Sequence, residues 1–244
     1  MARVDRSIAG GDTMYGGNDV HYFGVAESAL RVLLGALETA GTTPRRILDF
    51  GCGYGRVMRT LRAAYPEAEL LACDVDSHAV AHCATAFGAR PVTSATEIDR
   101  VERVQEVNLI WCGSVLTHLD EGQWPALIGY FGDALAIGGV AVMTTCGRVV
   151  AAKLADDTDY GLTPEARESM LASYRSRGFG YHDYPGQTGY GLSLSTPAWA
   201  VGQVSPIPGL RLIGYIEAGW DRHQDVIAVM KDSPGPGIIA RGAC

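Results

Sequence analysis

The clearest chemical pattern in the 244-residue chain stands at alternating positions of one short stretch: Asp49, Gly51, Gly53 and Gly55. Glycines let the backbone turn sharply and come close to a ligand, because no Cβ stands in the way. The apolar residues before the first glycine predict a buried strand, and a helix is expected over 56–64. A strand, a glycine turn and a helix whose free N–H groups point forward are typical of a nucleotide-binding turn.

The spacing of the glycines excludes two common phosphate-binding sites. A dinucleotide fingerprint requires G-x-G-x-x-G, and its last position is Arg56 here. A P-loop requires Gly-Lys followed by Ser or Thr, which the stretch lacks. The remaining pattern, acid-x-G-x-G-x-G, resembles the first motif of class I S-adenosylmethionine (SAM) dependent methyltransferases. This resemblance implies a Rossmann-like α/β fold, SAM as the cofactor and S-adenosylhomocysteine as a product.

The residue types of the motif suit SAM, which has no phosphate but has a cationic amino-acid end and a ribose. A carboxylate beside the glycines, Asp49, suits the ammonium group. A second acid for the ribose hydroxyls is expected at the end of the next strand, roughly twenty residues on. Asp74 ends the apolar run 69–73 and fills this position. The sequence therefore predicts that Asp49, the three glycines and Asp74 bind SAM.

Strands and helices are expected to alternate along the first two thirds of the chain. An amphipathic helix is predicted over 24–40, and further strands over 69–73, 89–93, 107–112 and 140–145. This alternation predicts a parallel sheet with helices on both faces. A strand over 210–215 and a returning strand over 224–230 are predicted to form a hairpin. The expected fold is thus a seven-stranded, mostly parallel sheet whose last strand is antiparallel.

A narrower resemblance rests on Leu48–Arg59, on Ser114–Leu119 and on the Gly138-Gly139 pair. These motifs are similar to those of a bacterial group of small methyltransferases, several of which are assigned to sugars or secondary metabolites. Two positions depart from the group: Cys146 replaces a frequent histidine, and Asn108 replaces a usual aspartate. In this kind of fold the loops after the third and fourth strands lie beside the cofactor. The resemblance therefore implies further cofactor contacts at Ser94, Gly113 and Ser114.

Two histidines are candidates for the catalytic base. Methyl transfer is an in-line displacement, so the protein chiefly holds the nucleophile near the methyl group. A hydroxyl acceptor also benefits from a general base, whereas an amine needs only to arrive neutral. His118 follows the fourth strand and His223 lies in the hairpin turn, so both are expected at one edge of the sheet. A structural role in local packing or hydrogen bonding remains the alternative for each.

Residues 147–208 interrupt the alternation with a long stretch rich in tyrosine and glycine. Long insertions in compact domains are usually functional, and we expect a largely irregular substrate cap here. Within it a helix is predicted over 163–176, because Thr163-Pro164-Glu165 is a good helix start. Three aromatic residues are predicted to contact the acceptor, with a plain core position as the alternative: Tyr22, Tyr190 and Trp220. The expected organisation is a lid or tail (1–23), a SAM-binding core (24–146), the cap (147–208), a hairpin (209–231) and a flexible tail (232–244).

The composition and net charge of the chain argue against several classes of partner. A net charge of −7 argues against nucleic acid and against an anionic membrane surface. We expect no membrane span and no signal peptide, which predicts a cytoplasmic protein. The six cysteines form no C-x-x-C pair, so reduced, buried thiols are expected in place of zinc ligands. No metal is expected, because Asp120 and Glu121 are interpreted as the start of a helix.

These features together predict a SAM-dependent methyltransferase that acts on a small polar acceptor, at a hydroxyl oxygen of a sugar or secondary metabolite. Three alternatives stay open. The enzyme could methylate a small amine, or use SAM in a reaction without methyl transfer. The chain could also be a SAM-binding module without activity. The sequence leaves the oligomeric state open, a homodimer included.

Overall fold

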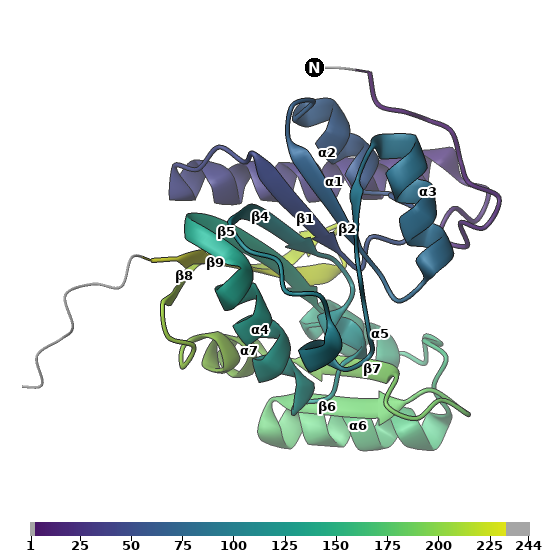
Figure 1. Ribbon diagram of the computed structural model, residues 1–244. Coiled ribbons are helices and arrows are strands. Elements are labelled where there is room, and N and C mark those ends of the chain that lie inside the picture. The colour runs from purple at the N-terminus through teal and green to yellow at the C-terminus, as the bar shows by residue number, and fades with distance from the viewer. Residues whose placement is uncertain (1–2, 233–244) are drawn as a thin grey trace, which may run out of the picture.

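The computed structural model describes residues 3–232, and a seven-stranded sheet crosses its centre (Figure 1). The strand order is β3-β2-β1-β4-β5-β9-β8. The strands are β1 (Arg46–Phe50), β2 (Glu69–Cys73), β3 (Arg90–Val92), β4 (Val107–Cys112), β5 (Leu135–Thr145), β8 (Leu210–Trp220) and β9 (Gln224–Lys231). Neighbours among β1–β5 pair in parallel, and β9 is antiparallel to both β5 and β8. The predicted fold class is confirmed.

Helices cover both faces of this sheet. One face carries α1 (Asp19–Ala40), α2 (Met58–Ala64) and α3 (Ser77–Phe87), and the other carries α4 (Gln123–Ala134) and α7 (Pro197–Val204) (Figure 1). Leu33 and Met58 pack with Leu109 on the first face, while Trp124 packs with Ile110 on the second. A strand that is buried on both faces needs apolar side chains at consecutive positions. This explains the continuous apolar runs from which the strands were predicted.

Helix α1 begins five residues earlier than the sequence predicted. The side chain of Asn18 accepts a hydrogen bond from the backbone N–H of His21 and so caps the helix at Asp19. The predicted boundary of the lid at residue 23 is therefore wrong, because 19–23 are helical. Helix α2 also differs from its prediction: it begins at Met58 instead of residue 56, because the turn continues through Val57.

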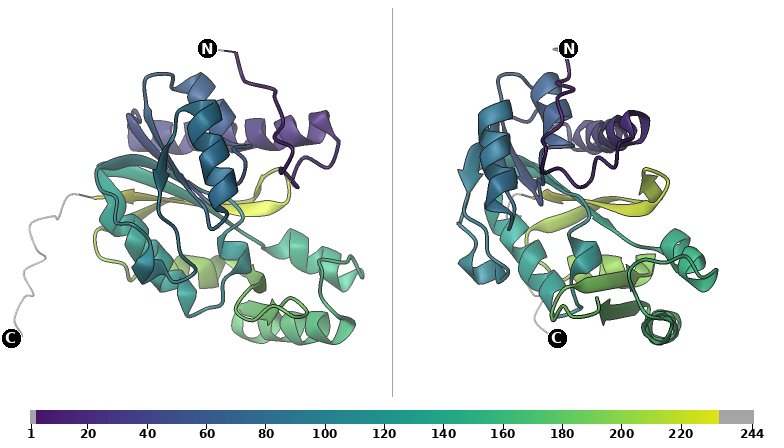
Figure 2. Two further views of the ribbon diagram at one scale, coloured as in Figure 1. Left: turned by 45° about the vertical axis from the view of Figure 1, so that its right-hand side comes forward. Right: turned by 90° about the vertical axis from the view of Figure 1, so that its right-hand side faces the viewer.

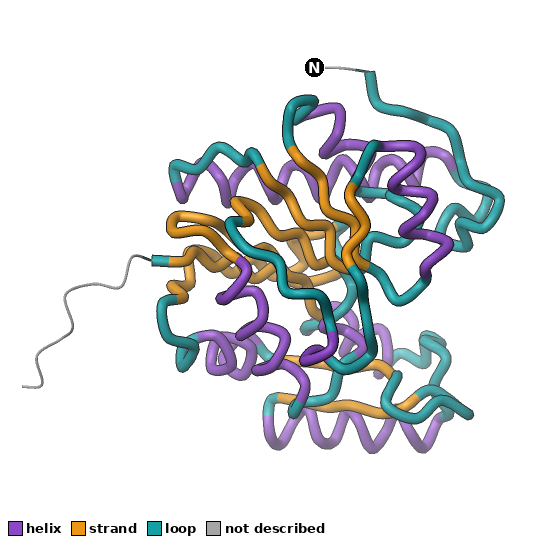
Figure 3. Tube along the Cα trace, viewed as in Figure 1, coloured by secondary structure: helices purple, strands orange, loops and turns teal. Residues whose placement is uncertain are grey.

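The segment 3–18 packs against the glycine turn and α2. The guanidinium of Arg59 is 1% exposed and donates to the backbone carbonyls of Asp5 and Ser7 at 3.1 and 2.7 Å. Gly11 lies directly against the ring of Tyr54, where an added Cβ would come within 2.5 Å of the hydroxyl oxygen. In Figure 3 this segment is the loop that runs past α3 to the start of α1. The amino-terminal segment thus has a fixed place beside the predicted cofactor site.

The insertion between β5 and β8 has more regular structure than predicted: the helix expected over 163–176 is confirmed as α6, and further helices and a hairpin accompany it. The insertion contains α5 (Arg148–Ala155), α6 (Pro164–Arg177), the hairpin of β6 (Phe179–Asp183) and β7 (Gly191–Ser195), and then α7. α5, α6 and the β6–β7 hairpin pack together to one side of the main sheet (Figure 2). They share a small apolar core in which Val150, Met170 and Leu194 meet. Helix α7 packs in the core of the main sheet, so the cap as the structure has it is shorter than the predicted 147–208. From here on the cap means residues 147–195.

Helix α1 corrects the expectation that no segment could span a membrane. By length and composition it passes such a test, with a mean hydropathy of 1.2 in its most apolar window. Half of that window is buried inside the protein, where α1 packs on the sheet. A core helix passes the same test, so the finding by itself places no part of the chain in a membrane.

Candidate active site

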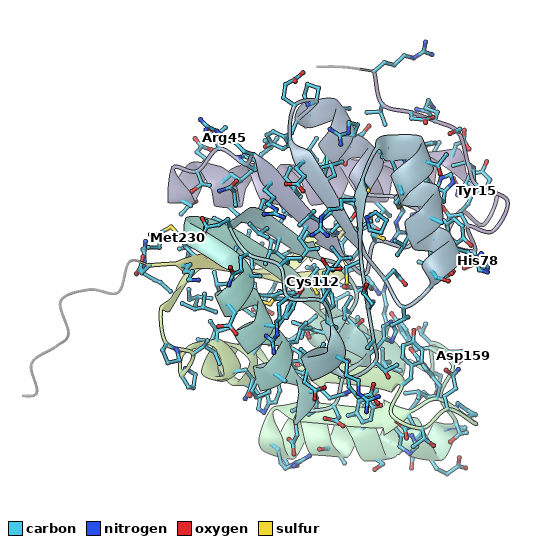
Figure 4. All side chains as sticks on the ribbon, in the orientation of Figure 1. Tyr15, Arg45, His78, Cys112, Asp159 and Met230 are labelled. Atoms are coloured by element: carbon cyan, nitrogen blue, oxygen red, sulfur yellow. The ribbon has the colours of Figure 1, made fainter. Side chains whose placement is uncertain are left out.

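The residues predicted to bind SAM lie at or directly after the carboxyl ends of β1, β2, β3 and β4. Parallel strands bring their carboxyl ends to one edge of the sheet, where ligands bind in open α/β folds. Cys112, the last residue of β4, lies near the centre of the molecule, whereas Arg45, before β1, and Met230, on β9, lie at its periphery (Figure 4). The predicted site thus lies at the edge of the sheet where β4 ends, away from the periphery that Arg45 and Met230 occupy.

The glycine turn uses its three glycines for two different reasons. All three have positive φ angles, of 78° at Gly51, 48° at Gly53 and 79° at Gly55, a region that glycine enters without strain. A Cβ on Gly51 would lie 2.5 Å from the side chain of Val115, and one on Gly55 would lie 2.3 Å from the ring of Phe87. A Cβ on Gly53 would meet nothing within 4 Å. Close packing against Val115 and Phe87 thus explains why positions 51 and 55 require glycine. Gly53 instead faces open space that a ligand can fill.

Asp49 presents a buried carboxylate that lacks a partner. The residue is 2% exposed, and its Oδ2 atom has no hydrogen-bond partner among the described residues. Burial, together with the nearby charge of Asp74, raises the pKa of Asp49 to about 8, while Arg56 acts in the opposite direction. A buried anion without a partner is costly, and a cationic group placed beside it would remove that cost. The ammonium group of an amino-acid ligand fits this position.

Asp74 joins the loop after β2 to the glycine turn. Its Oδ2 accepts a hydrogen bond from the backbone N–H of Gly53 at 2.8 Å, and its Oδ1 accepts one from Asp76 at 2.9 Å. Each carboxylate oxygen can accept a second hydrogen bond. Asp74 can therefore hold the turn in place and still accept from a ribose hydroxyl.

The loop after β4 is held by a network that the sequence analysis missed. Ser114 has a φ of 62°; its N–H donates to Thr144 Oγ1 at 2.8 Å, and its Oγ accepts from Gln224 Nε2 at 2.6 Å. Thr144 in turn donates to Gln224 Oε1. The residue before it, Gly113, packs closely on Trp111: a Cβ on Gly113 would lie 2.7 Å from the Trp111 ring. The sequence could have indicated Gln224 by its position directly after His223, in the hairpin expected at the same edge of the sheet as the cofactor site.

Ser94 follows β3 at the same edge of the sheet. Ser94 is half-buried, and its side chain forms no hydrogen bond to another residue within 3–232. The predicted contact of Ser94 with the cofactor stays a prediction.

His118 is held in one tautomer by the cap. Its Nδ1 lies 2.8 Å from the carbonyl oxygen of Gly191, which can only accept, so Nδ1 carries the proton and Nε2 of the neutral ring has a free lone pair. The ring stacks on Tyr190 with a centroid distance of 4.8 Å, and the hydroxyl of Tyr184 lies 3.5 Å from Nδ1. Burial lowers the pKa of His118, which favours the neutral form. This geometry suits a general base.

His223 has the opposite tautomer. Its Nδ1 lies 3.2 Å from the ammonium of Lys153, which can only donate, so Nδ1 accepts and Nε2 carries the proton. Burial and the charge of Lys153 lower the pKa of His223, and its ring is parallel to that of Tyr160 at 6.0 Å. In this state the free nitrogen of His223 is a hydrogen-bond donor. Of the two histidines, His118 has the arrangement that a base requires.

The three predicted acceptor contacts lie in two places. Tyr190 is 46% exposed and stacks on His118. Tyr22 and Trp220 are buried: the hydroxyl of Tyr22 donates to Asp12, and the Trp220 indole N–H donates to the carbonyl of Val25 at 3.0 Å. The assignment of Tyr22 and Trp220 to the acceptor is not supported, because their side chains are occupied inside the fold.

The structural expectations for the cysteines and for Asp120 hold. Five cysteines lie in the described part of the chain, and all of them are buried and free. Oδ1 of Asp120 accepts hydrogen bonds from the backbone N–H groups of Gly122 and Gln123 at the start of α4, as predicted. Within residues 3–232, no group of three or more His, Cys, Asp or Glu side chains is arranged to hold a metal ion.

Comparison with protein families identifies the chain's central part. Residues 48–141, which contain the glycine turn, Asp74 and the Ser114 loop, match a family model described as a methyltransferase domain. This part of the chain is similar to methyltransferase domains, and the fold is that of class I SAM-dependent methyltransferases. No curated protein matches the chain at a significant level.

Solved structures share the fold of this chain at low sequence identity. A SAM-dependent methyltransferase from Clostridium acetobutylicum matches with a TM-score of 0.57 and 11% identity, over 91% of this chain and 96% of that one. An O-methyltransferase family protein from Burkholderia thailandensis matches with a TM-score of 0.54 and 14% identity, over 88% of this chain and 59% of that one. Human N-acetylserotonin methyltransferase, solved with SAM, matches with a TM-score of 0.54 and 14% identity, over 88% of this chain and 58% of that one. The chain thus spans less than two thirds of the last two proteins.

The residues at the sheet edge fit SAM. The partnerless oxygen of Asp49 suits the ammonium, Asp74 suits the ribose hydroxyls, and Gly53 leaves the approach open. When bound, SAM supplies a methyl group on a positively charged sulfur, which a nucleophile can displace. The remaining work of the protein is to hold that nucleophile in line, keep water out and receive a proton where one is released.

Proposed function

We propose that this methyltransferase transfers the methyl group of SAM to a hydroxyl oxygen of a small polar molecule, with His118 as the general base. The observation that carries the proposal is the hydrogen bond between His118 Nδ1 and the Gly191 carbonyl, because it leaves Nε2 free to accept a proton. A base is useful for a hydroxyl acceptor and unnecessary for a neutral amine. The likeness to an O-methyltransferase family protein gives this proposal further support.

In the proposed step, the hydroxyl oxygen of the acceptor forms a bond to the methyl carbon of SAM. At the same time the carbon–sulfur bond breaks, and its electron pair stays on the sulfur. The hydroxyl proton moves to Nε2 of His118. The products are a methyl ether, S-adenosylhomocysteine and a protonated His118, which then releases its proton to water. Burial favours this release, since it lowers the pKa of His118.

The cap supplies the space and the aromatic walls for a small acceptor. A cavity of about 410 Å³ opens in the cap, lined by Tyr184, the start of α6 and the 185–188 loop. Pockets of a few hundred Å³ or more are the usual size for small-molecule ligands. Tyr184 lines this cavity and also lies beside His118, and Tyr190 stacks on the imidazole with its ring 5.5 Å from that of Tyr184. We infer a substrate that reaches His118 along these tyrosines, in a cytoplasmic enzyme.

The test uses SAM with a ¹³C-labelled methyl group and a panel of phenols, sugars and amines. The carbon chemical shift of the product distinguishes a methyl ether from a methylamine. We expect ether products, and a loss of turnover of about 10²–10⁴-fold in His118→Gln at unchanged SAM affinity. His223→Gln is the matched control and should retain turnover. Methylation of amines alone, or equal activity of the two variants, would contradict the proposal.

A further inference from the structure

The cavity in the cap is lined by an acidic residue and by no strongly basic one. Asp183, the last residue of β6, lines it together with Tyr184, and none of the described residues around it is a lysine or an arginine. Arg167, on the adjoining helix α6, already pairs with Asp157 at 3.2 Å. A site with a carboxylate and no fixed positive charge favours a cationic ligand over an anionic one.

One oxygen of the Asp183 carboxylate is held by the cap, and the other is free. Oδ1 accepts hydrogen bonds from the hydroxyl of Tyr181 at 2.6 Å and from the backbone N–H of Gly189 at 3.1 Å. Within residues 3–232, Oδ2 forms no hydrogen bond and no ion pair, and the residue is half-buried. A carboxylate that is already fixed loses little further freedom when it binds a cation.

The rest of the lining offers further hydrogen-bond acceptors. Nδ1 of His182 lies 2.9 Å from the carbonyl oxygen of Asp183, which can only accept, so Nδ1 carries the proton and Nε2 of the neutral ring is an acceptor. Gln187 and Thr188 also line the cavity, and their side chains contain oxygen acceptors. The face of the Tyr184 ring can attract a positive charge. A primary ammonium, with its charge and three N–H donors, fits this set of groups.

Asp183 lies one cross-strand pair away from the proposed base. It stands opposite Gly191 in the β6–β7 ladder, where a Cβ on Gly191 would lie 2.7 Å from the Asp183 Cα. The carbonyl of Gly191 is the group that lies 2.8 Å from Nδ1 of His118. Tyr184, which follows Asp183, lines the cavity and has its hydroxyl 3.5 Å from the same nitrogen. An elongated acceptor can therefore have one end at Asp183 and the other at His118.

We propose that the acceptor carries a primary ammonium group besides the hydroxyl that is methylated, and that Asp183 binds this ammonium. Because it names a feature of the same acceptor, this assignment rests on the proposed function. An amine that a carboxylate holds as an ammonium has no lone pair and cannot attack the methyl group. The ion pair with Asp183 thus leaves the hydroxyl beside His118 as the nucleophile.

The experiment measures the binding of three phenols to the protein saturated with S-adenosylhomocysteine. The side chain of tyramine ends in an ammonium, that of 3-(4-hydroxyphenyl)propionate ends in a carboxylate, and 4-ethylphenol has no charge. Calorimetry should show that tyramine binds about 10- to 100-fold more tightly than the other two, the usual gain from a charge-assisted hydrogen bond. Asp183→Asn keeps an oxygen for Tyr181 and Gly189 but removes the charge, so this preference should disappear. Unchanged binding of 4-ethylphenol shows that the variant is folded.

Asp159→Asn is the matched control. It makes the same change of charge in the loop whose Gly161 packs on the Tyr184 ring, but Asp159 is exposed and does not line the cavity. The preference for tyramine should survive in this variant, because an exposed charge is screened. Equal binding of the three phenols, no binding of any of them, or a preference that survives in Asp183→Asn would overturn the proposal. Methylation of bound tyramine on nitrogen would instead contradict the proposed function, since the binding preference is measured without methyl transfer.

Discussion

The carbonyl oxygen of Gly191 lies 2.8 Å from Nδ1 of His118 and joins the cap to the edge of the main sheet. Gly191 begins β7, and His118 ends the short 3₁₀ turn after β4 (Leu116–His118). A second bond, from Ser193 Oγ to the carbonyl of Leu116 at 2.8 Å, ties the same two segments together. The proton position on the imidazole is therefore set by the placement of the cap.

The pH dependence of the reaction should report on His118. Burial lowers its pKa from 6.5, so the neutral form prevails at lower pH than for a free imidazole. We expect kcat/KM to rise with pH through a midpoint below 6.5 and to be level at pH 7. The pH profile of the wild-type enzyme measures this midpoint. A midpoint above 6.5, or the same rising limb in His118→Gln, would argue against the assignment.

SAM binding should release protons near neutral pH. With a pKa of about 8, Asp49 is mostly protonated at pH 6–7 in the free protein, and it must ionise to bind an ammonium. Calorimetry in buffers of different ionisation enthalpy should show release of close to one proton per SAM at pH 6.5. Asp49→Asn should release none. Equal proton release by both proteins would show that the proton comes from another group.

The free protein should become more stable when Asp49 loses its charge. The folded pKa is raised above the ordinary value of 3.8, so the folded state binds more protons, and its stability falls as pH rises from about 4 to 8. Asp49→Asn removes this cost, and each kcal/mol gained should raise Tm by about 2–4 °C. Thermal unfolding at pH 8 without SAM measures the difference. An unchanged or lower Tm would mean that Asp49 has partners that the structure does not show.

Alanine at Gly53 and at Gly55 should have different effects. Both positions have positive φ, so each substitution carries a similar backbone cost of about 1–2 kcal/mol. Gly55→Ala also forces a Cβ against Phe87, and should lose a further ~1–3 kcal/mol of unfolding free energy. Gly53→Ala meets no protein atom and should instead weaken SAM binding. Urea unfolding of both variants measures the loss of stability, and titration with SAM measures the loss of affinity. A larger loss of stability in Gly53→Ala than in Gly55→Ala would contradict the prediction.

Gln224 should matter for the loop after β4. Its amide donates to Ser114 and accepts from Thr144, and the residue is 9% exposed. Gln224→Leu leaves both hydroxyls short of a partner and should lower the unfolding free energy by about 1–3 kcal/mol. Adding Ser114→Ala should recover part of this loss, because it removes the hydroxyl that Gln224→Leu leaves unpaired while Thr144 keeps its bond to the Ser114 N–H. Strictly additive losses in the double variant would show that the two residues act independently.

Local patterns predicted the sheet well, because its inner strands are buried on both faces and its glycine turn has a fixed spacing. The strand 107–112 matches β4 at both ends. The insertion was harder: β6 and β7 are short and contain Gly180, Gly191 and polar residues, so they have no apolar run. Gln224 was missed as a site residue because its role depends on side chains distant in sequence. The burial of Tyr22 and Trp220 likewise could not be predicted from local patterns.

The cap begins and ends at one point of the fold. The backbone N–H of Ser195, its last residue, donates to the carbonyl of Cys146, just before its first, at 2.9 Å. The hydroxyls of Thr145 and Ser195 lie 2.9 Å apart at the same place. A segment whose two ends meet can be exchanged for another without moving β5 or the strands that hold Asp49 and Asp74. Caps of other lengths could thus be inserted between Cys146 and Ser195 to accept new substrates, while the residues predicted to bind the cofactor stay in place.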